Sequence, residues 1–201
     1  MGLSVSSLFA PAIPEIDERA FGLNDLHSAV RKGQVAVARQ LLLTQEHLAT
    51  EKTSDGYSVF HLCSTISSNA VGLDMAVALA ASRDALAQVN DKDARGFAAI
   101  HLMASNGRTD VLEHLLPAMQ IDVKTGEGRT ALHLAVQHPS TVHLLLRSGL
   151  ADSFDNFGIS ALHVAAMVGA TETVNLLVQV WFCVLVLPWS QCLCFRARVA
   201  K

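Results

Sequence analysis

The sequence predicts an all-α fold: a solenoid of stacked helix pairs that are joined by hairpin loops. Three observations favour it. A motif in which glycine precedes histidine by five residues occurs five times in 201 residues, and an apolar run follows four of these motifs. Hydrophobic residues make up 51% of the chain and charged residues 16%, a balance that lets most of the chain bury a core. Recurrence at about 33 residues is typical of units that bury their apolar faces on their neighbours.

The glycine–histidine motif fixes the register of the repeats. Successive histidines are 34, 40, 32 and 30 residues apart. The apolar runs that follow are VARQLLL, VLEHLLP, TVHLLLR and TVNLLVQ. The five motifs are GLNDLH at 22–27, GYSVFH at 56–61, GFAAIH at 96–101, GRTALH at 128–133 and GISALH at 158–163.

The fourth unit shows how each unit is expected to form two helices. Thr130 is a suitable N-cap, because its hydroxyl can accept a hydrogen bond from a free backbone N–H. The first helix is predicted over 131–137, with Leu132, Leu134 and Ala135 facing inward. The sequence His-Pro-Ser at 138–140 ends it, since proline cannot continue a helix interior.

The second helix of this unit is predicted to run from Ser140, as its cap, to Arg147. Gly149 suits the left-handed conformation that ends many helices. Residues 153–158 are then predicted to form a hairpin loop, because the Asp and Gly of DNFG supply turn chemistry.

The second unit departs from the others. Eleven residues separate His61 from Gly72, whereas the turn residue follows the histidine by six in the other units. We therefore expect STISSNAVG to bulge between the two helices or to extend one of them. Two interpretations stay open: a tolerated surface insertion, which costs little loop entropy, and a contact loop that takes part in binding.

At these motifs the sequence resembles the ankyrin repeat family. The family's first-helix signature is T-P-L-H-x-A, with a period of 33. TALHLA at 130–135 and SALHVA at 160–165 match it well, and AAIHLM, SVFHLC and NDLHSA match it less closely. The signature proline is absent from all five copies. Because this proline presets the first helical turn, its loss is expected to lower stability more than to change the fold.

The resemblance covers about residues 21–180 and predicts three parts. Residues 1–20 form a leader, 21–180 the repeat array, and 181–201 a hydrophobic tail that does not fit the repeat. The five repeats are expected to span 22–55, 56–95, 96–127, 128–157 and 158–180.

The nine histidines do not predict a metal centre. Five share one repeat position, where the resemblance implies structural hydrogen bonds between neighbouring repeats. Repeats packed roughly 10 Å apart separate them too far to share one metal ion with ligands at about 2.0–2.1 Å. The acidic turn at 91–93 lacks the other ligands of a calcium loop. No G-x-S-x-G, C-x-x-C or H-E-x-x-H motif occurs, so no catalytic residue, cofactor or enzyme activity is predicted.

A protein partner is expected instead. A net charge of −3 and 5% aromatic residues argue against nucleic acid, which favours a basic stripe or stacking aromatics. The resemblance implies contacts on the concave face, through hairpin tips and first helices. Residues just after the leading glycine and at the ends of first helices map there, and they include types enriched in binding hot spots. The candidate partner-binding residues are Arg31, Lys32, Tyr57, Phe97, Arg129, Ile159 and Met167.

The N-terminus carries a lipidation pattern. MGLSVS matches M-G-x-x-x-[ST], which directs myristoylation of Gly2. MGLSVSSLF also resembles the start of the ADP-ribosylation factor GTPases, which are myristoylated. No G-x-x-x-x-G-K-[ST] phosphate loop follows, so no GTPase is implied. One myristoyl chain alone binds membranes only marginally.

The C-terminus carries an uncharged run over 173–195, followed by three basic residues. A bilayer span needs about 20 residues, so the run is long enough. Three interpretations stay open: a membrane segment, a hydrophobic cap over repeat five, and an end foreign to the repeat array. In the first case Cys192 and Cys194 are candidates for palmitoylation.

The sequence therefore predicts a non-catalytic, monomeric protein-interaction module in the cytoplasm. Four cysteines without disulfide or zinc spacing fit a reducing compartment. The alternative is a membrane-associated ankyrin adaptor, or the N-terminal ankyrin portion of a membrane protein, held by Gly2 myristoylation, by the run at 173–195, or by both.

Overall fold

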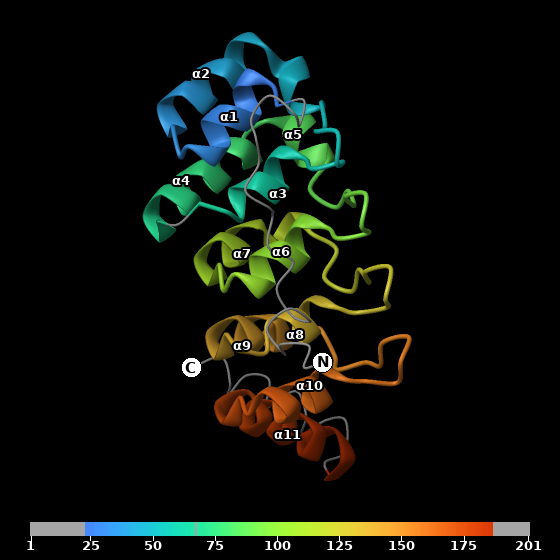
Figure 1. Ribbon diagram of the computed structural model, residues 1–201. Coiled ribbons are helices and arrows are strands. Elements are labelled where there is room, and N and C mark those ends of the chain that lie inside the picture. Colours follow the sequence, from blue (N-terminus) through green and yellow to red (C-terminus); the bar gives the residue numbers. More distant parts are fainter. Residues whose placement is uncertain (1–22, 67, 187–201) are drawn as a thin grey trace.

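The structure, a computed structural model, describes residues 23–66 and 68–186, with side chains up to residue 180. Short helices pair along the chain, and the pairs stack in sequence order into one column (Figure 1). Among these residues there is no extended strand, only two isolated bridges, Lys92–Ala98 and Phe154–Ser160. The predicted all-α solenoid is confirmed.

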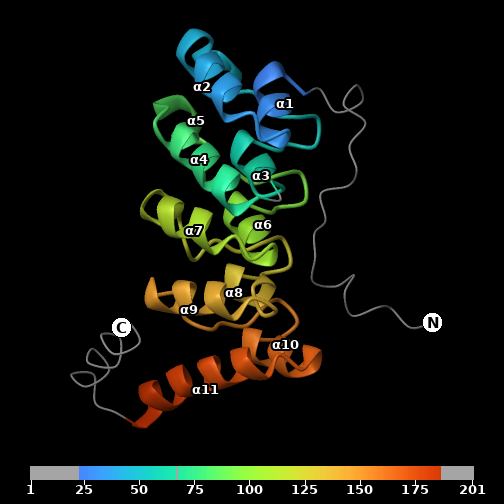
Figure 2. The ribbon, with the colours of Figure 1, turned by 90° about the vertical axis from the view of Figure 1, so that its left-hand side faces the viewer.

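Each unit contributes two helices, and the two sets lie on opposite sides of the stack (Figure 2). The first helices are α1 (Asp25–Arg31), α3 (Val59–Cys63), α6 (Ala99–Ser105), α8 (Ala131–Leu134) and α10 (Ala161–Val168). The second helices are α2 (Val35–Thr44), α4 (Asn69–Ala80), α7 (Thr109–Leu115), α9 (Pro139–Arg147) and α11 (Thr171–Val186). Three short pieces follow second helices: η2 (Glu46–Ala49), α5 (Arg83–Ala87) and η3 (Leu116–Ala118).

The fourth unit confirms the predicted inward face and corrects the helix ends. Leu132 and Ala135 are 0% exposed and Leu134 is 4% exposed. Thr130 is the N-cap, but its hydroxyl lies 3.0 Å from His133 Nδ1 instead of capping a backbone N–H. α8 ends at Leu134, three residues before the predicted end at 137.

The start of α9 also differs from the prediction. His138, not Ser140, is the N-cap, and Pro139 is the first helical residue. Proline suits this place because it has no N–H to leave unpaired and its backbone angle is already helical. Gly149 has a φ of 99° just after the helix, so its predicted left-handed conformation is confirmed.

Of the two expectations for the second unit, a bulge between the helices is wrong and a longer helix is confirmed, because α4 has 12 residues and includes residues 69–72. α4 begins at Asn69, eight residues after His61, and α7 begins at Thr109, eight residues after His101. The connection therefore has the same length in both units, and Gly72 lies inside α4 rather than at a turn. The extra residues of this unit follow later, in the 12-residue α4 and in α5.

Gly72→Ala is expected to raise the free energy of unfolding by about 0.5–1 kcal/mol, because glycine in a helix interior costs about that much relative to alanine. A Cβ atom there would meet Val111 Cγ2 at 3.5 Å, an ordinary contact. Urea unfolding followed by circular dichroism measures the change. Gly107→Ala is the control: its φ is +65° and a Cβ atom would collide with the His138 ring, so stability should fall. A loss for Gly72→Ala would show that α7 packs too closely to accept a methyl group.

A continuous hydrophobic core runs between the two helix layers, from Leu26 in α1 to Leu177 in α11. α11 continues to Val186, past the predicted repeat boundary at residue 180. Of the helices the structure describes, none has both the length and the apolar character to cross a membrane. Residues 187–195 of the uncharged run lie outside the described part of the chain.

Candidate functional site

Four hairpin loops share one backbone design. Each loop turns at a glycine with positive φ, for example 83° at Gly96, which glycine adopts without strain. Three residues before the glycine, a Thr or Asp oxygen accepts a hydrogen bond from the backbone N–H four residues later. These bonds are Thr53 to Tyr57 (3.0 Å), Asp93 to Phe97 (2.7 Å), Thr125 to Arg129 (3.1 Å) and Asp155 to Ile159 (2.9 Å).

Neighbouring hairpins also bond to one another. The Ala94 N–H donates to the Asp55 carbonyl at 2.9 Å, and the Asn156 N–H donates to the Glu127 carbonyl at 3.0 Å. Two lysines also join neighbouring hairpins, further from the tips. Lys92 Nζ of the second hairpin donates to the Lys124 carbonyl of the third at 2.7 Å, and Lys124 Nζ donates to the Phe154 carbonyl of the fourth at 3.2 Å. The hairpins therefore form one connected edge (Figure 1).

A histidine in each of three first helices ties its unit to the following hairpin, as the resemblance implied. Each Nε2 atom donates to a backbone carbonyl: His61 to Phe97 (2.9 Å), His101 to Val123 (2.9 Å) and His133 to Ile159 (3.0 Å). Each Nδ1 atom accepts from the backbone N–H of the N-cap residue: Ser58 (3.1 Å), Ala98 (3.0 Å) and Thr130 (3.2 Å).

These contacts fix the histidines in one neutral form. Because a backbone N–H can only donate, Nδ1 must accept, and the single ring proton stays on Nε2. Burial lowers the pKa of His61 and His133, and it lowers the pKa of His101 to about 4. A proton added at Nδ1 would face a donor, so these rings act as structural bridges between repeats.

Tyr57 belongs to the core rather than to the candidate surface. It is 2% exposed, and its ring lies 5.8 Å from the His61 ring. Its hydroxyl accepts from Arg95 Nη2 at 2.9 Å. The physical reason is the turn: the residue after the glycine starts the return path into the stack, where the Thr53 hydroxyl holds its N–H.

Phe97, Arg129 and Ile159 occupy the same place in the next hairpins and are half-buried. The Arg95 guanidinium lies 5.4 Å from the centre of the Phe97 ring. The Arg129 side chain is 14% exposed and forms ion pairs with Glu127 (3.3 Å) and Asp155 (3.6 Å). Arg129 therefore links its own hairpin to the next one.

Asp155 anchors the last hairpin. Burial alone would raise the pKa of its carboxyl, but the N–H groups of Ile159 and Phe157 donate to it at 2.9 Å, and Arg129 lies nearby. These favourable contacts outweigh burial and lower the pKa. The carboxylate therefore stays charged and keeps the turn rigid at neutral pH.

The remaining candidates lie where first helices end. Arg31 is half-buried at the end of α1, and Lys32 is exposed next to it. Met167 is 61% exposed near the end of α10. These three residues stay candidates for partner contact. The lipidation candidates Gly2, Cys192 and Cys194 lie outside the described residues.

The residues at the hairpin tips were not among the candidates predicted from the sequence. The tip residue comes directly before the turn glycine, two positions earlier than the predicted set. In chain order the tips are Asp55, Arg95, Glu127 and Phe157. The side chains of Arg95 and Glu127 are 44% and 56% exposed, and Phe157 is 69% exposed. The aligned turn glycines could have identified them, because the positive-φ residue turns the chain and leaves its predecessor outermost.

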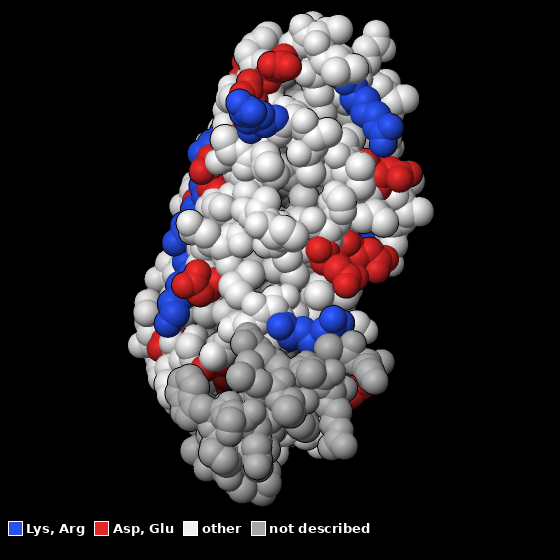
Figure 3. Space-filling view, turned by 180° about the vertical axis from the view of Figure 1, so that it is seen from behind, with Lys and Arg blue, Asp and Glu red and all other residues white. Residues whose placement is uncertain are grey.

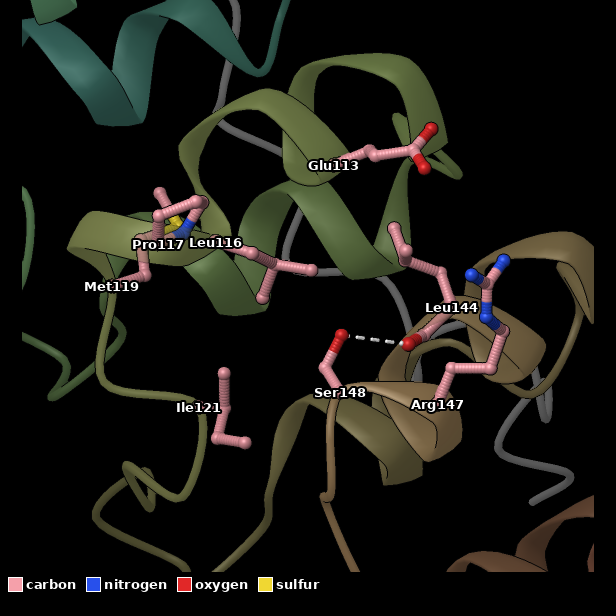
Figure 4. Close-up of a pocket in the computed structure, with 8 residues that line it drawn as sticks. All are labelled: Glu113, Leu116, Pro117, Met119, Ile121, Leu144, Arg147 and Ser148. Carbon is pink, nitrogen blue, oxygen red and sulfur yellow. Dashed lines mark hydrogen bonds between the residues drawn. The ribbon is translucent and has the colours of Figure 1, made fainter. Parts of the chain in front are cut away.

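The opposite side, formed by second helices, carries shallow grooves. One groove of about 490 Å³ lies between η3 and α9 and is lined by Leu116, Met119, Ile121 and Leu144 (Figure 4). Its Ser148 hydroxyl already donates to the Leu144 carbonyl at 2.9 Å. Glu113 and Arg147 line it as well, so the groove combines an apolar floor with two side chains of opposite charge.

Charges on this side gather along its two edges, with acidic and basic residues interspersed and a weakly charged band between them (Figure 3). Neither the acidic nor the basic residues form a continuous charged patch over the part of the surface that this view describes. In the described ranges, no three His, Cys, Asp or Glu side chains come together as metal ligands would.

Comparison with known proteins gives one consistent result. A family model described as ankyrin repeats (three copies) matches residues 70–153 and 100–184. The tyrosine-protein kinase HTK16 of Hydra vulgaris is 36% identical over 97 residues, which are 45% of this chain and 13% of that protein. The human transient receptor potential cation channel subfamily A member 1 is 35% identical over 86 residues, 40% of this chain and 8% of the channel.

Human Rabankyrin-5 is 29% identical over 129 residues, 61% of this chain and 11% of that protein. The chain thus spans a small part of each of these three relatives.

Proposed function

The chain belongs to the ankyrin repeat family, and on that basis we propose that it binds a protein partner along its hairpin tips and first helices. Ankyrin repeats are a non-catalytic protein-interaction module. The proposed mechanism is steric: a rigid surface holds another protein or masks part of it.

Phe157 is the observation that carries this proposal. It is an aromatic residue, 69% exposed, at the tip of the fourth hairpin. The loop below it is held by two hydrogen bonds to Asp155, at 2.9 Å each. A rigid, exposed aromatic ring can bury its area on a partner at about 25 cal/mol per Å² while losing little loop entropy.

The row of tips indicates the chemistry of the partner. Along the stack the tips are acidic at Asp55, basic at Arg95, acidic at Glu127 and aromatic at Phe157. A complementary segment would present basic, acidic and basic groups in turn and then an apolar pocket. Opposite charges at successive tips favour one register of such a segment over the others.

Phe157→Ala is expected to weaken partner binding by about 1–2 kcal/mol, or roughly 5–30-fold in Kd, as aromatic hot spots do. The full chain, immobilised, would be exposed to cytosolic extract, and the proteins that it retains would be identified and their affinities measured. The thermal unfolding temperature should stay unchanged, because the side chain is largely outside the core.

The matched control is Leu43→Ala. Leu43 is 83% exposed in α2, in the set of second helices, so its removal should leave binding intact. A partner lost with Leu43→Ala but kept with Phe157→Ala would place the binding surface on the second helices and overturn the proposal.

The proposal includes a cytoplasmic, monomeric protein. Cys63 is a free, buried thiol, which fits a reducing compartment. The features that suggest membrane attachment are Gly2, the uncharged run over 173–195, Cys192 and Cys194; of these, Gly2, residues 187–195 and both cysteines lie outside the described part of the chain.

A further inference from the structure

The fifth repeat ends in a face that is covered in every other repeat. We define the C-terminal face as Phe154, Leu162, His163 and Ala166. His163 and Ala166 are exposed and Leu162 is half-buried. The positions equivalent to His163 are His27, His61, His101 and His133, all 0% exposed. The positions equivalent to Ala166 are Val30, Ser64, Ala104 and Val136, and all four are buried.

Contacts in the middle of the stack show that the next repeat covers the equivalent face of the earlier repeats. The Thr173 hydroxyl of repeat five donates to the Val136 carbonyl of repeat four at 2.8 Å, and Asn106 of repeat three donates to the Ser64 carbonyl of repeat two at 3.1 Å. The position of Ala166 is therefore the one on which the next unit sits. In repeat five, no element that the structure describes sits there.

His163 keeps the donor geometry of the other repeats. Its Nδ1 accepts from the Ser160 N–H at 3.2 Å, so its proton is on Nε2, as in His133. In His133 that proton goes to the Ile159 carbonyl at 3.0 Å. Among the described residues His163 Nε2 has no such acceptor, and any backbone segment laid across the face would supply one.

Phe154 makes the face more apolar than the earlier ones. It occupies the hairpin place of Lys92 and Lys124, which reach the carbonyls of the next hairpin. Phe154 is 54% exposed, and its ring lies 6.3 Å from the His163 ring. Because this side chain is apolar, the face is better suited to contact with an apolar segment than with a further hairpin in the same register.

We propose that residues 187–201 of this chain pack on the C-terminal face as its cap. α11 has 16 residues, which is about 24 Å at 1.5 Å per residue. The segment that follows it, 187–201, can extend up to roughly 50 Å. It is therefore long enough to return along the whole of α11 and to cross α10.

The composition of this segment fits the face. Pro188 favours a turn directly after the helix. Leu187, Trp189, Leu193 and Phe195 supply apolar side chains that match the apolar part of the face. A tethered segment also acts at an effective concentration in the mM range, which favours it over a second copy of the chain.

A disulfide test addresses this contact in the full chain. In a Cys183→Ser background, Ala166→Cys places a thiol on the C-terminal face, and Ala36→Cys places one on an exposed site of α2 at the other end of the stack (Figure 1). Cys63 does not compete, because burial raises its pKa to about 12. After mild oxidation, mass spectrometry of the digested protein would locate the disulfides.

The expected result is an intrachain disulfide from residue 166 to Cys192 or Cys194 that forms roughly tenfold or more faster than any from residue 36. Equal rates at both sites, or no disulfide at residue 166, would overturn the proposal. Interchain disulfides at residue 166 would overturn it too, and would assign the face to a second copy of the chain.

Discussion

Leu132→Ala is expected to lower the free energy of unfolding by about 2–5 kcal/mol, the usual cost of removing a large buried side chain and leaving a cavity. Leu132 lies in α8, in the middle of the stack, and is 0% exposed. Its cavity would have repeats on both sides, so the surrounding structure has little freedom to collapse into it. Urea unfolding monitored by circular dichroism gives the value.

Leu43→Ala is the matched control. Leu43 lies in α2 and is 83% exposed. Its removal should lower the free energy of unfolding clearly less than that of Leu132. If Leu132→Ala costs less than about 1 kcal/mol, the first helices do not pack as the structure places them.

Acid is expected to destabilise the protein between about pH 6.5 and pH 4. The pKa of His101 falls from its ordinary value of 6.5 to about 4 in the folded protein, chiefly through burial. In this pH range the His101 ring binds a proton in the unfolded chain but stays neutral in the folded protein. Each such histidine therefore lowers the free energy of unfolding by about 1.4 kcal/mol per pH unit as the pH falls. His101 alone lowers it by about 3 kcal/mol in total. Above pH 6.5 its contribution is complete.

His61 and His133 act in the same direction, because burial lowers the pKa of each. The measurement is the free energy of unfolding at a series of pH values. His101→Gln should flatten this profile. A profile that stays flat from pH 7 to pH 4 in the unchanged protein would contradict the assignment of neutral, bridging rings.

Much of this fold could be predicted from the sequence because its signal repeats. The glycine–histidine spacing placed every first helix, since the histidine and the turn glycine each have a fixed physical role. The inward set of Leu132, Leu134 and Ala135 followed from helical spacing in the same way. Because the motif occurs five times, a unit that matches it weakly is supported by the units that match it well.

The errors arose where one residue type serves two purposes. Gly72 was taken for a turn glycine, yet it lies inside α4, because a helix tolerates an isolated glycine at a modest cost in stability. Tyr57 was placed on the surface because the resemblance maps the residue after the leading glycine there, but side-chain direction after a turn depends on backbone angles that this position alone does not reveal. The tip residues were missed for the same reason.

The bridging histidines show how this architecture can change in length. Each ring is fixed by an N–H of its own unit and by a carbonyl of the next, so a unit needs to recognise only its immediate neighbours. Duplicating or deleting an internal unit joins two surfaces that already match, and the distant units keep every contact that they had. Gene duplication can thus change the length of the repeat array by whole repeats without requiring a different hydrophobic core.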